Sequence, residues 1–195
     1  MEEKKLPSSD EIARELSREQ YKKRYKKTLK STIFALITAA AVAVLIATLW
    51  MPVLQIFGTS MTPTLAEGEI VVCTKLDEKN MKPGDIIAFY YGNKVLVKRY
   101  IAGPGSWVEL QEDGTLIVDG AVQEEPYLPE GQKHLGICDL EMPYQVPEGT
   151  YFLIGDMRET SVDSRHSSVG CIAEENIVGK IVYRVWPFKA LGTVH

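Results

Sequence analysis

The sequence predicts a mainly β protein, with an antiparallel β-sheet or partly open barrel anchored by one N-terminal transmembrane helix. Two observations lead to this fold class. Residues 31–66 carry no charged side chain, and most of that stretch is apolar. Beyond residue 55, short runs of β-branched and aromatic residues are separated by glycine-containing turns, with no long amphipathic helical pattern among them. Short strands without intervening helices favour antiparallel pairing.

The start of the chain is basic and the rest is acidic. Residues 1–30 contain ten Lys or Arg and six Asp or Glu, a net charge of +4, whereas residues 31–195 carry −8. A basic segment suits the surface of an anionic membrane. The acidic remainder argues against nucleic acid as a partner. We therefore expect residues 1–31 to form a cytoplasmic, lipid-facing arm.

The apolar stretch is long enough to cross a bilayer. Residues 33–54 are 22 residues long and contain two polar side chains, Thr38 and Thr48. A helix of that length spans about 33 Å, close to the hydrocarbon thickness of a membrane. The sequence thus predicts a transmembrane helix over residues 32–54. The alternative is a cleaved signal peptide, and the long, acid-containing segment before the apolar stretch argues against it.

The flanking charges predict the orientation of this helix. Lysine and arginine crowd its N-terminal flank, and no cation follows it before Lys75. The positive-inside rule then places the N-terminus in the cytoplasm and residues 55–195 outside. We expect a single-pass protein of the cell membrane with an extracytoplasmic domain.

That domain, residues 55–195, is expected to consist of strands. Gly92 and Asn93 are a hairpin turn signal between two of them. Residues 121–148 are rich in Pro, Gly and Glu, and we expect a long excursion or small cap there rather than a second core. The predicted strands cover residues 69–75, 85–91, 94–101, 107–110, 115–118, 151–154 and 176–185.

The cysteines and histidines indicate neither a metal site nor a cofactor. Cys73, Cys138 and Cys171 allow at most one disulfide, and the sequence does not say which. Their spacing matches no zinc pattern, and no histidine clusters with them. We expect no metal and no cofactor.

Ser60 is a candidate nucleophile just beyond the apolar stretch. Gly58 permits a tight backbone, and Pro63 biases Thr62 towards an extended conformation. A serine in such a turn has an accessible hydroxyl and backbone N–H. Taken alone, an ordinary structural turn is the more frequent explanation.

A serine hydroxyl needs a base, and Lys98 is the main candidate. His134 lies in the excursion and His195 is the last residue, so His166 is the only serious rival histidine. An ordinary lysine is only about 0.04% neutral at pH 7, so it must be buried to act as a base. Lys98 follows an apolar run in a predicted strand, although an exposed edge lysine is the common alternative.

The polar run at residues 155–165 follows the apolar strand 151–154. Asp163 and Arg165 can pair and fix this loop. Ser161 can hydrogen-bond a neutral amine and orient it. Each of these roles fits a site that contains a buried lysine.

Together these segments resemble the motifs of bacterial type I signal peptidases, in that family's order and after one membrane span. The resemblance rests on four segments: Ser60-Met61-x-Pro63-Thr64-Leu65, Gly84-Asp85-Ile86, Lys98-Arg99, and the run from Gly155-Asp156 to Asp163-Ser164-Arg165. It implies that Ser60 is the nucleophile, Lys98 the general base and Ser161 the residue that orients the lysine. It further implies structural support from Gly155, Asp156, Asp163 and Arg165.

The sequence departs from the family pattern at two places. Ala102, Gly103 and Ser106 differ from the family's usual turn after the lysine. Gly58 stands where some members have a serine that helps to form the oxyanion hole. We therefore expect the hole to use the Ser60 backbone N–H, with its second donor unassigned.

The resemblance implies a membrane-bound serine endopeptidase that removes signal peptides through an acyl-enzyme. Its partners would be preproteins with A-x-A-like cleavage sites and the lipid bilayer, with the secretion translocon as a further candidate. The substrate would add as a strand near residues 55–58 and 96–97. We expect its side chains to contact Phe57, Met61, Ile86, Leu96 and Val97.

Other function classes fit the sequence less well. A self-cleaving stress regulator would need a partner domain and no membrane span. A penicillin-binding type of enzyme would have lysine, not Pro63, three residues after the serine. A membrane-anchored β-module that only binds partners, or an inactive homologue, stays open until cleavage of a preprotein is tested.

Overall fold

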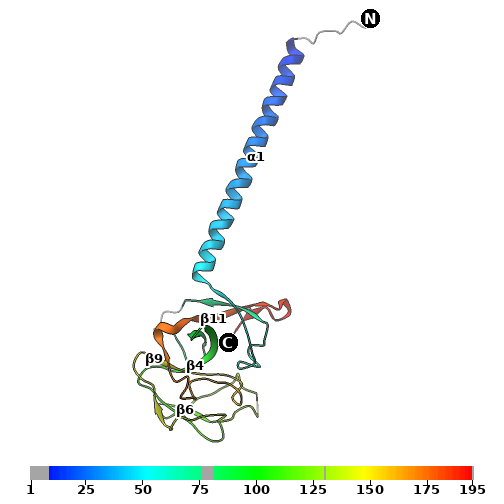
Figure 1. The fold of residues 1–195 in the computed structure, drawn as a ribbon. Coiled ribbons are helices and arrows are strands. Elements are labelled where there is room, and N and C mark those ends of the chain that lie inside the picture. Colours follow the sequence, from blue (N-terminus) through cyan, green and yellow to red (C-terminus); the bar gives the residue numbers. More distant parts are fainter. Residues whose placement is uncertain (1–8, 76–80, 130, 195) are drawn as a thin grey trace. The chain divides into compact units, whose positions relative to one another are not determined.

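The computed structural model describes residues 9–75, 81–129 and 131–194. The chain divides into two compact units at Leu49 and Trp50, and each is described by itself (Figure 1).

The described residues of the first unit form one long helix, α1 (Ser9–Trp50), whose last residue already belongs to the second unit. By length and composition, its segment Ala13–Leu45 is long and apolar enough to cross a membrane. A signal sequence near the N-terminus passes the same test. The helix ends at Trp50, so the apolar stretch predicted as helical to residue 54 is divided. Pro52 disfavours helical geometry at the residue before it and lacks an N–H, and strand β1 begins at Val53.

In the described part of the second unit lie the strands and two short 3₁₀ helices, η2 (Glu174–Asn176) and η3 (Phe188–Ala190). The strands are β1 (Val53–Gln55), β2 (Ile70–Thr74), β3 (Ile86–Tyr91), β4 (Lys94–Ala102), β5 (Trp107–Leu110), β6 (Leu116–Val118), β7 (Ala121–Val122), β8 (Tyr144–Gln145), β9 (Thr150–Ile154), β10 (Ile172–Ala173), β11 (Ile177–Trp186) and β12 (Gly192–Thr193).

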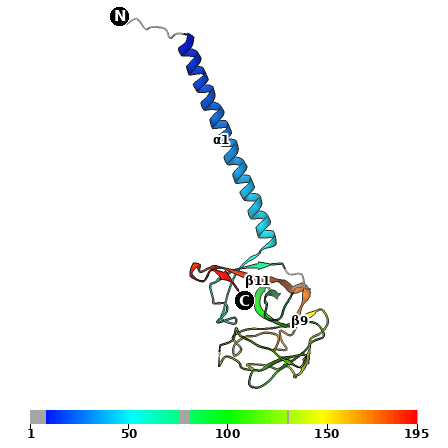
Figure 2. The same ribbon diagram turned by 180° about the vertical axis from the view of Figure 1, so that it is seen from behind.

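These strands form two antiparallel sheets, which confirms the predicted fold class. The larger sheet has the order β1-β2-β11-β3-β4-β9-β10, and β12 pairs with β11. The smaller sheet has the order β7-β6-β5-β8. β11 pairs with both β2 and β3 and contains several register shifts. Such irregularities bend a strand, and Figure 2 shows β11 as a curved ribbon.

The predicted excursion at residues 121–148 is part of the second sheet and its core. Its two ends form strands β7 and β8, and its side chains Leu135 and Leu140 pack against the core cluster of Val108, Leu116 and Phe152. That cluster also contains residues of β4 and β9, so the excursion is packed directly onto strands of the larger sheet.

One edge of β4 is open beside the candidate site. β3 pairs with β4 along residues 94–99, whereas β9 pairs with β4 only from Arg99 onward. Among the described strands, residues 94–98 therefore have a neighbour on one side only. An open edge of this kind can accept an added strand.

Candidate active site

Ser60 lies in a tight turn that is fixed at both ends. Gly58 has φ of +81°, a conformation that favours glycine. Thr62 N–H donates to Thr59 O at 3.0 Å, and the neighbouring Met61 is buried in a core cluster. Ser60 O accepts a hydrogen bond from Met157 N–H at 3.0 Å, which ties this turn to the loop after β9.

Lys98 lies on β4, and its environment suits a base. The residue is 3% exposed, and burial lowers its pKa to about 8, while the charge of Asp163 acts against this decrease. Its side chain lines one cavity of about 510 Å³ together with Ser60. We call this the dyad cavity; Leu96, Thr160, Val162 and Val169 also line it.

The loop at residues 155–165 is held by the Asp163–Arg165 ion pair. Arg165 Nε donates to Asp163 Oδ1 and Arg165 Nη2 to Asp163 Oδ2, each at 2.9 Å, and both side chains are buried. Burial alone would raise the pKa of Asp163, but the hydrogen bonds and charge of Arg165 outweigh it, so this pKa lies below its ordinary value. Gly155 N–H also donates to Asp163 Oδ2, at 2.9 Å.

Ser161 is oriented by the same carboxylate. Its hydroxyl donates to Asp163 Oδ2 at 2.6 Å, which leaves the oxygen lone pairs free to accept from another donor. Gly155 makes room for it, because a Cβ at position 155 would lie 2.1 Å from Ser161 Oγ and 2.7 Å from Ser60 O. Ser60 and Ser161 thus approach Gly155 from two parts of the chain.

Arg99 and Asp156 form a second buried ion pair next to Lys98. Arg99 Nε and Nη2 donate to the two oxygens of Asp156 at 2.8 and 2.7 Å, and Nη1 donates to Gly84 O at 2.6 Å. The guanidinium also lies 3.6 Å from the centre of the Tyr127 ring. Sequence reasoning assigned Arg99 no role, although a strand covered on both faces would bury it and require an acidic partner.

The excursion supplies a third buried pair that the sequence did not suggest. Arg158 donates to Glu125 Oε1 and, at 3.2 Å, to Gly155 O. Tyr127 OH donates to the same Glu125 oxygen at 2.7 Å. No local pattern around Glu125 could have revealed this contact, because its partner lies 33 positions away.

A second cavity, which we call the groove, adjoins Ser60. It has a volume of about 740 Å³ and is lined by residues 53–58, Ser60, Met61 and residues 94–97. The predicted substrate contacts Phe57, Met61, Leu96 and Val97 all line it. Ile86 does not: it is 1% exposed and packs in the core cluster that contains Met61. The alternation of side chains along a strand predicts which face a residue lies on, but not whether other side chains cover it, so the sequence could not exclude Ile86.

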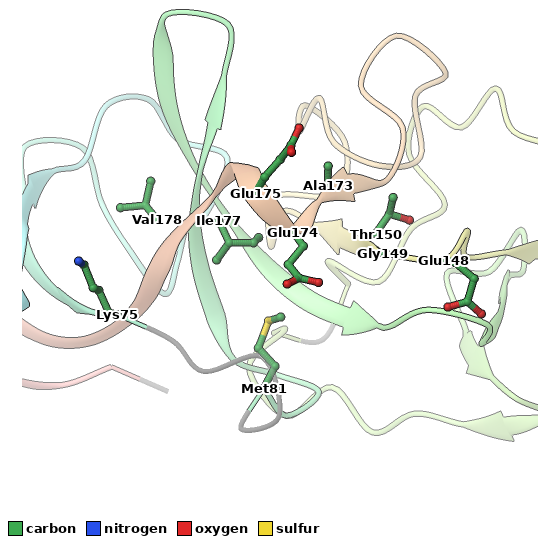
Figure 3. A pocket seen from close by; sticks show the side chains of 10 residues that line it. All are labelled: Lys75, Met81, Glu148, Gly149, Thr150, Ala173, Glu174, Glu175, Ile177 and Val178. Atoms are coloured by element: carbon green, nitrogen blue, oxygen red, sulfur yellow. The ribbon is translucent and has the colours of Figure 1, made fainter.

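A cavity of about 710 Å³ lies elsewhere, and neither Ser60 nor Lys98 lines it. Figure 3 shows its lining, which comes from residues at or near β9, β10, η2 and β11 together with Lys75, Met81 and Glu148. It is separate from the candidate active site.

The histidines and cysteines do not join the site. His166 lines neither the groove nor the dyad cavity, His134 lies on the surface 3.8 Å from Glu159, and His195 is outside the described residues. All three cysteines are free. Burial raises the pKa of Cys73 to about 12, which makes it an inert core thiol.

A β-domain in which a serine and a buried lysine line one cavity defines a candidate serine hydrolase. Residues 29–186 match the family described as signal peptidase, peptidase S26. The chain therefore belongs to this family of serine peptidases. Together with α1, this membership indicates a membrane-anchored protein and supports removal of signal peptides by a serine peptidase.

Individual relatives agree with the family. Signal peptidase IB of Staphylococcus aureus strain Mu50 is 39% identical over 150 residues, which are 69% of this chain and 77% of that protein. Thylakoidal processing peptidase 1, chloroplastic, of Arabidopsis thaliana is 38% identical over 144 residues, 66% of this chain and 40% of that protein. A crystal structure of a signal peptidase I from Enterococcus faecalis V583 is 30% identical and covers 53% of this chain and 98% of its own. Its TM-score is 0.43, too low to bear on the fold.

Proposed function

We propose that this chain is a single-pass membrane endopeptidase that removes signal peptides from secreted preproteins with a Ser60/Lys98 dyad. Its N-terminus would lie in the cytoplasm and its β-domain outside. One observation carries the proposal: Lys98 is buried with its pKa lowered to about 8, in the same cavity as Ser60. At pH 7 roughly a tenth of such lysines are neutral, against about 0.04% of ordinary ones.

The reaction is acyl transfer. Neutral Lys98 takes the proton of the Ser60 hydroxyl as the oxygen attacks the carbonyl of the residue before the cut. The lysine then gives this proton to the leaving amine, and the mature protein departs. An ester between Ser60 and the signal peptide remains. Lys98 next removes a proton from water as the water oxygen attacks the ester carbonyl, and it returns this proton to Ser60 Oγ as the ester bond breaks, which releases the signal peptide and restores neutral lysine and free serine.

Two further groups would assist this reaction. Ser161 would accept a hydrogen bond from the Lys98 nitrogen during the reaction, because its own proton is directed to Asp163 and its oxygen lone pairs are available. The Ser60 backbone N–H donates to the oxyanion; among the described residues it has no hydrogen-bond acceptor of its own.

The substrate binds in the groove as an added strand. The open edge of β4 at residues 94–97 forms one wall of the groove, and residues 53–58 form the other. Backbone hydrogen bonds hold the peptide, and apolar walls admit small side chains two positions apart, at −1 and −3. Attachment to the bilayer raises the effective concentration of substrates that are themselves membrane-bound. The secretion translocon is a further proposed partner.

The decisive experiment compares Ser60→Ala and Lys98→Arg with wild-type enzyme in detergent, with a purified preprotein as substrate. Both variants should lose at least about a thousandfold in kcat/KM, because alanine removes the nucleophile and arginine keeps its proton. Lys82→Arg, at an exposed position, is the matched control and should cleave normally. Near-native cleavage by Lys98→Arg would overturn the dyad. Failure of the wild type to cut any preprotein would favour a binding module or an inactive homologue.

A further inference from the structure

The dyad cavity extends well beyond the two reacting groups. From Ser60 and Lys98 it continues along β4 past Leu96 to Lys94 and Asn93. Its volume of about 510 Å³ is larger than proton transfer between two side chains requires. The excess space is open to a part of the substrate.

The dyad cavity adjoins the groove, with which it shares Ser60, Lys94 and Leu96, and the two differ in which other side chains of β4 line them. Alternate side chains of a strand point to opposite faces, so Lys94, Leu96 and Lys98 share one face of β4. All three line the dyad cavity, and Lys94 and Leu96 also line the groove, whereas Val95 and Val97 line the groove but not the dyad cavity. A strand added to the open edge of β4 would therefore send its own alternate side chains into two different cavities.

The register follows from the proposed function, on which this inference rests. If the small side chains at −1 and −3 lie beside Val97 and Val95 in the groove, then −2 lies beside Leu96 and −4 beside Lys94. Both strands advance by about 3.3 Å per residue, so this correspondence holds over four positions.

The two ends of the cavity differ in chemistry. Near −2 the lining is apolar, with Leu96, Val162 and Val169. Tyr91, whose hydroxyl donates to Ser168 O at 3.0 Å, fixes the hairpin end. Near −4 the lining ends in Lys94. Among the described residues, Lys94 and Lys98 are the charged residues that line this cavity, and Lys94 has no ion-pair partner there.

We propose that the dyad cavity is the subsite for residues −2 and −4 of the signal peptide, and that Lys94 makes it select an acidic residue at −4. A bulky apolar side chain fills the cavity at −2. A carboxylate at −4 pairs with the Lys94 ammonium, and a lysine at −4 is repelled by it.

The test uses one preprotein in three forms, with Glu, Gln or Lys at −4 and alanine kept at −1 and −3. Initial rates with full-length enzyme in detergent give kcat/KM for each. A partly exposed pair is worth a few-fold, so wild type should prefer Glu over Lys by about tenfold when attraction and repulsion combine. Lys94→Gln should remove the preference, and Lys94→Glu should reverse it. The preference should also shrink at about 1 M salt, where charges are screened within roughly 3 Å.

Controls distinguish failure of the proposed subsite from failure of the proposed peptidase function. Lys82→Glu changes an exposed charge outside both cavities and should keep the wild-type preference. Equal cleavage of all three forms by wild type, or a preference unchanged in Lys94→Glu, overturns the subsite while the peptidase activity stands. If wild type cleaves none of the forms, nor the parent preprotein, the proposed function fails and the subsite with it.

Discussion

Lys98 and Arg99 are neighbours on β4, and both are buried cations, at 3% and 1% exposure. They differ in their partners. Arg99 is held by both oxygens of Asp156, by Gly84 O and by the Tyr127 ring. The Lys98 side chain has no hydrogen bond or ion pair to any described residue, and it lines the dyad cavity. Because Arg99 is paired, it stays charged and supports the fold. Lys98 has no such partner, so burial favours its neutral form, which is the form that can act as a base.

The largest effect is expected from removing the partner of Arg99. Asp156→Ala leaves a buried guanidinium without its carboxylate, so we expect a loss of about 3–5 kcal/mol in the free energy of unfolding. Urea titration of the full chain in detergent measures this. The double variant Arg99→Met with Asp156→Leu removes both charges and should recover most of the loss. A loss below about 1 kcal/mol in Asp156→Ala would mean that the pair is not needed for the fold.

Replacing Lys98 should change the free energy of unfolding in the opposite direction and stabilise the domain. The pKa of Lys98 is about 8 in the folded chain against 10.5 for an ordinary lysine, so the unfolded state binds more protons between these values. Wild-type stability should therefore rise with pH through this window. Lys98→Met should stabilise the domain at pH 7 by an amount on the order of 3 kcal/mol, while abolishing activity.

The same urea titration repeated from pH 7 to 10.5 checks the sign of this effect. The advantage of Lys98→Met should shrink as pH rises, whereas the exposed Lys82→Met should stay near wild type throughout. A stability difference that does not change with pH would show that packing, not charge, is responsible.

The pH dependence of catalysis follows from the same pKa. Lys98 must be neutral to act, so kcat/KM should fall about tenfold for each unit below pH 8, or roughly a hundredfold by pH 6. Initial cleavage rates across this range give the profile. Tryptophan fluorescence at each pH should show that the domain stays folded. A flat profile from pH 6 to 8 would contradict a lysine base.

The smallest effect is expected at Tyr127, where the excursion touches Arg99. Tyr127→Leu removes the ring from the guanidinium and the hydroxyl from Glu125, and should cost about 1–2 kcal/mol of stability. Tyr127→Phe keeps the ring and should cost about half as much. If the two variants are equally unstable, the ring contact contributes nothing.

Much of the site could be predicted from short segments of the sequence. Ser60, Lys98 and the polar loop each stand out against their neighbours in the sequence, and Asp163 and Arg165 pair across two positions. The contacts of Arg99 with Asp156 and of Arg158 with Glu125 join residues 57 and 33 positions apart. No periodic pattern connects such distant residues, so their pairing could not be predicted from one sequence.

The sequence by itself determined the apolar segment, the strand runs and the order of the motifs, because hydrophobic period, turn residues and local charge act between near neighbours in the chain. Only the tertiary structure decided that Arg99 is paired while Lys98 is not, and that Ile86 lies in the core cluster with Met61. It also decided that the excursion contacts Arg99 through Tyr127 and Arg158 through Glu125. Burial and pairing depend on which distant segments the sheet brings together. Burial of this kind lowers the pKa of Lys98 to about 8, on which the chemistry proposed for the site depends.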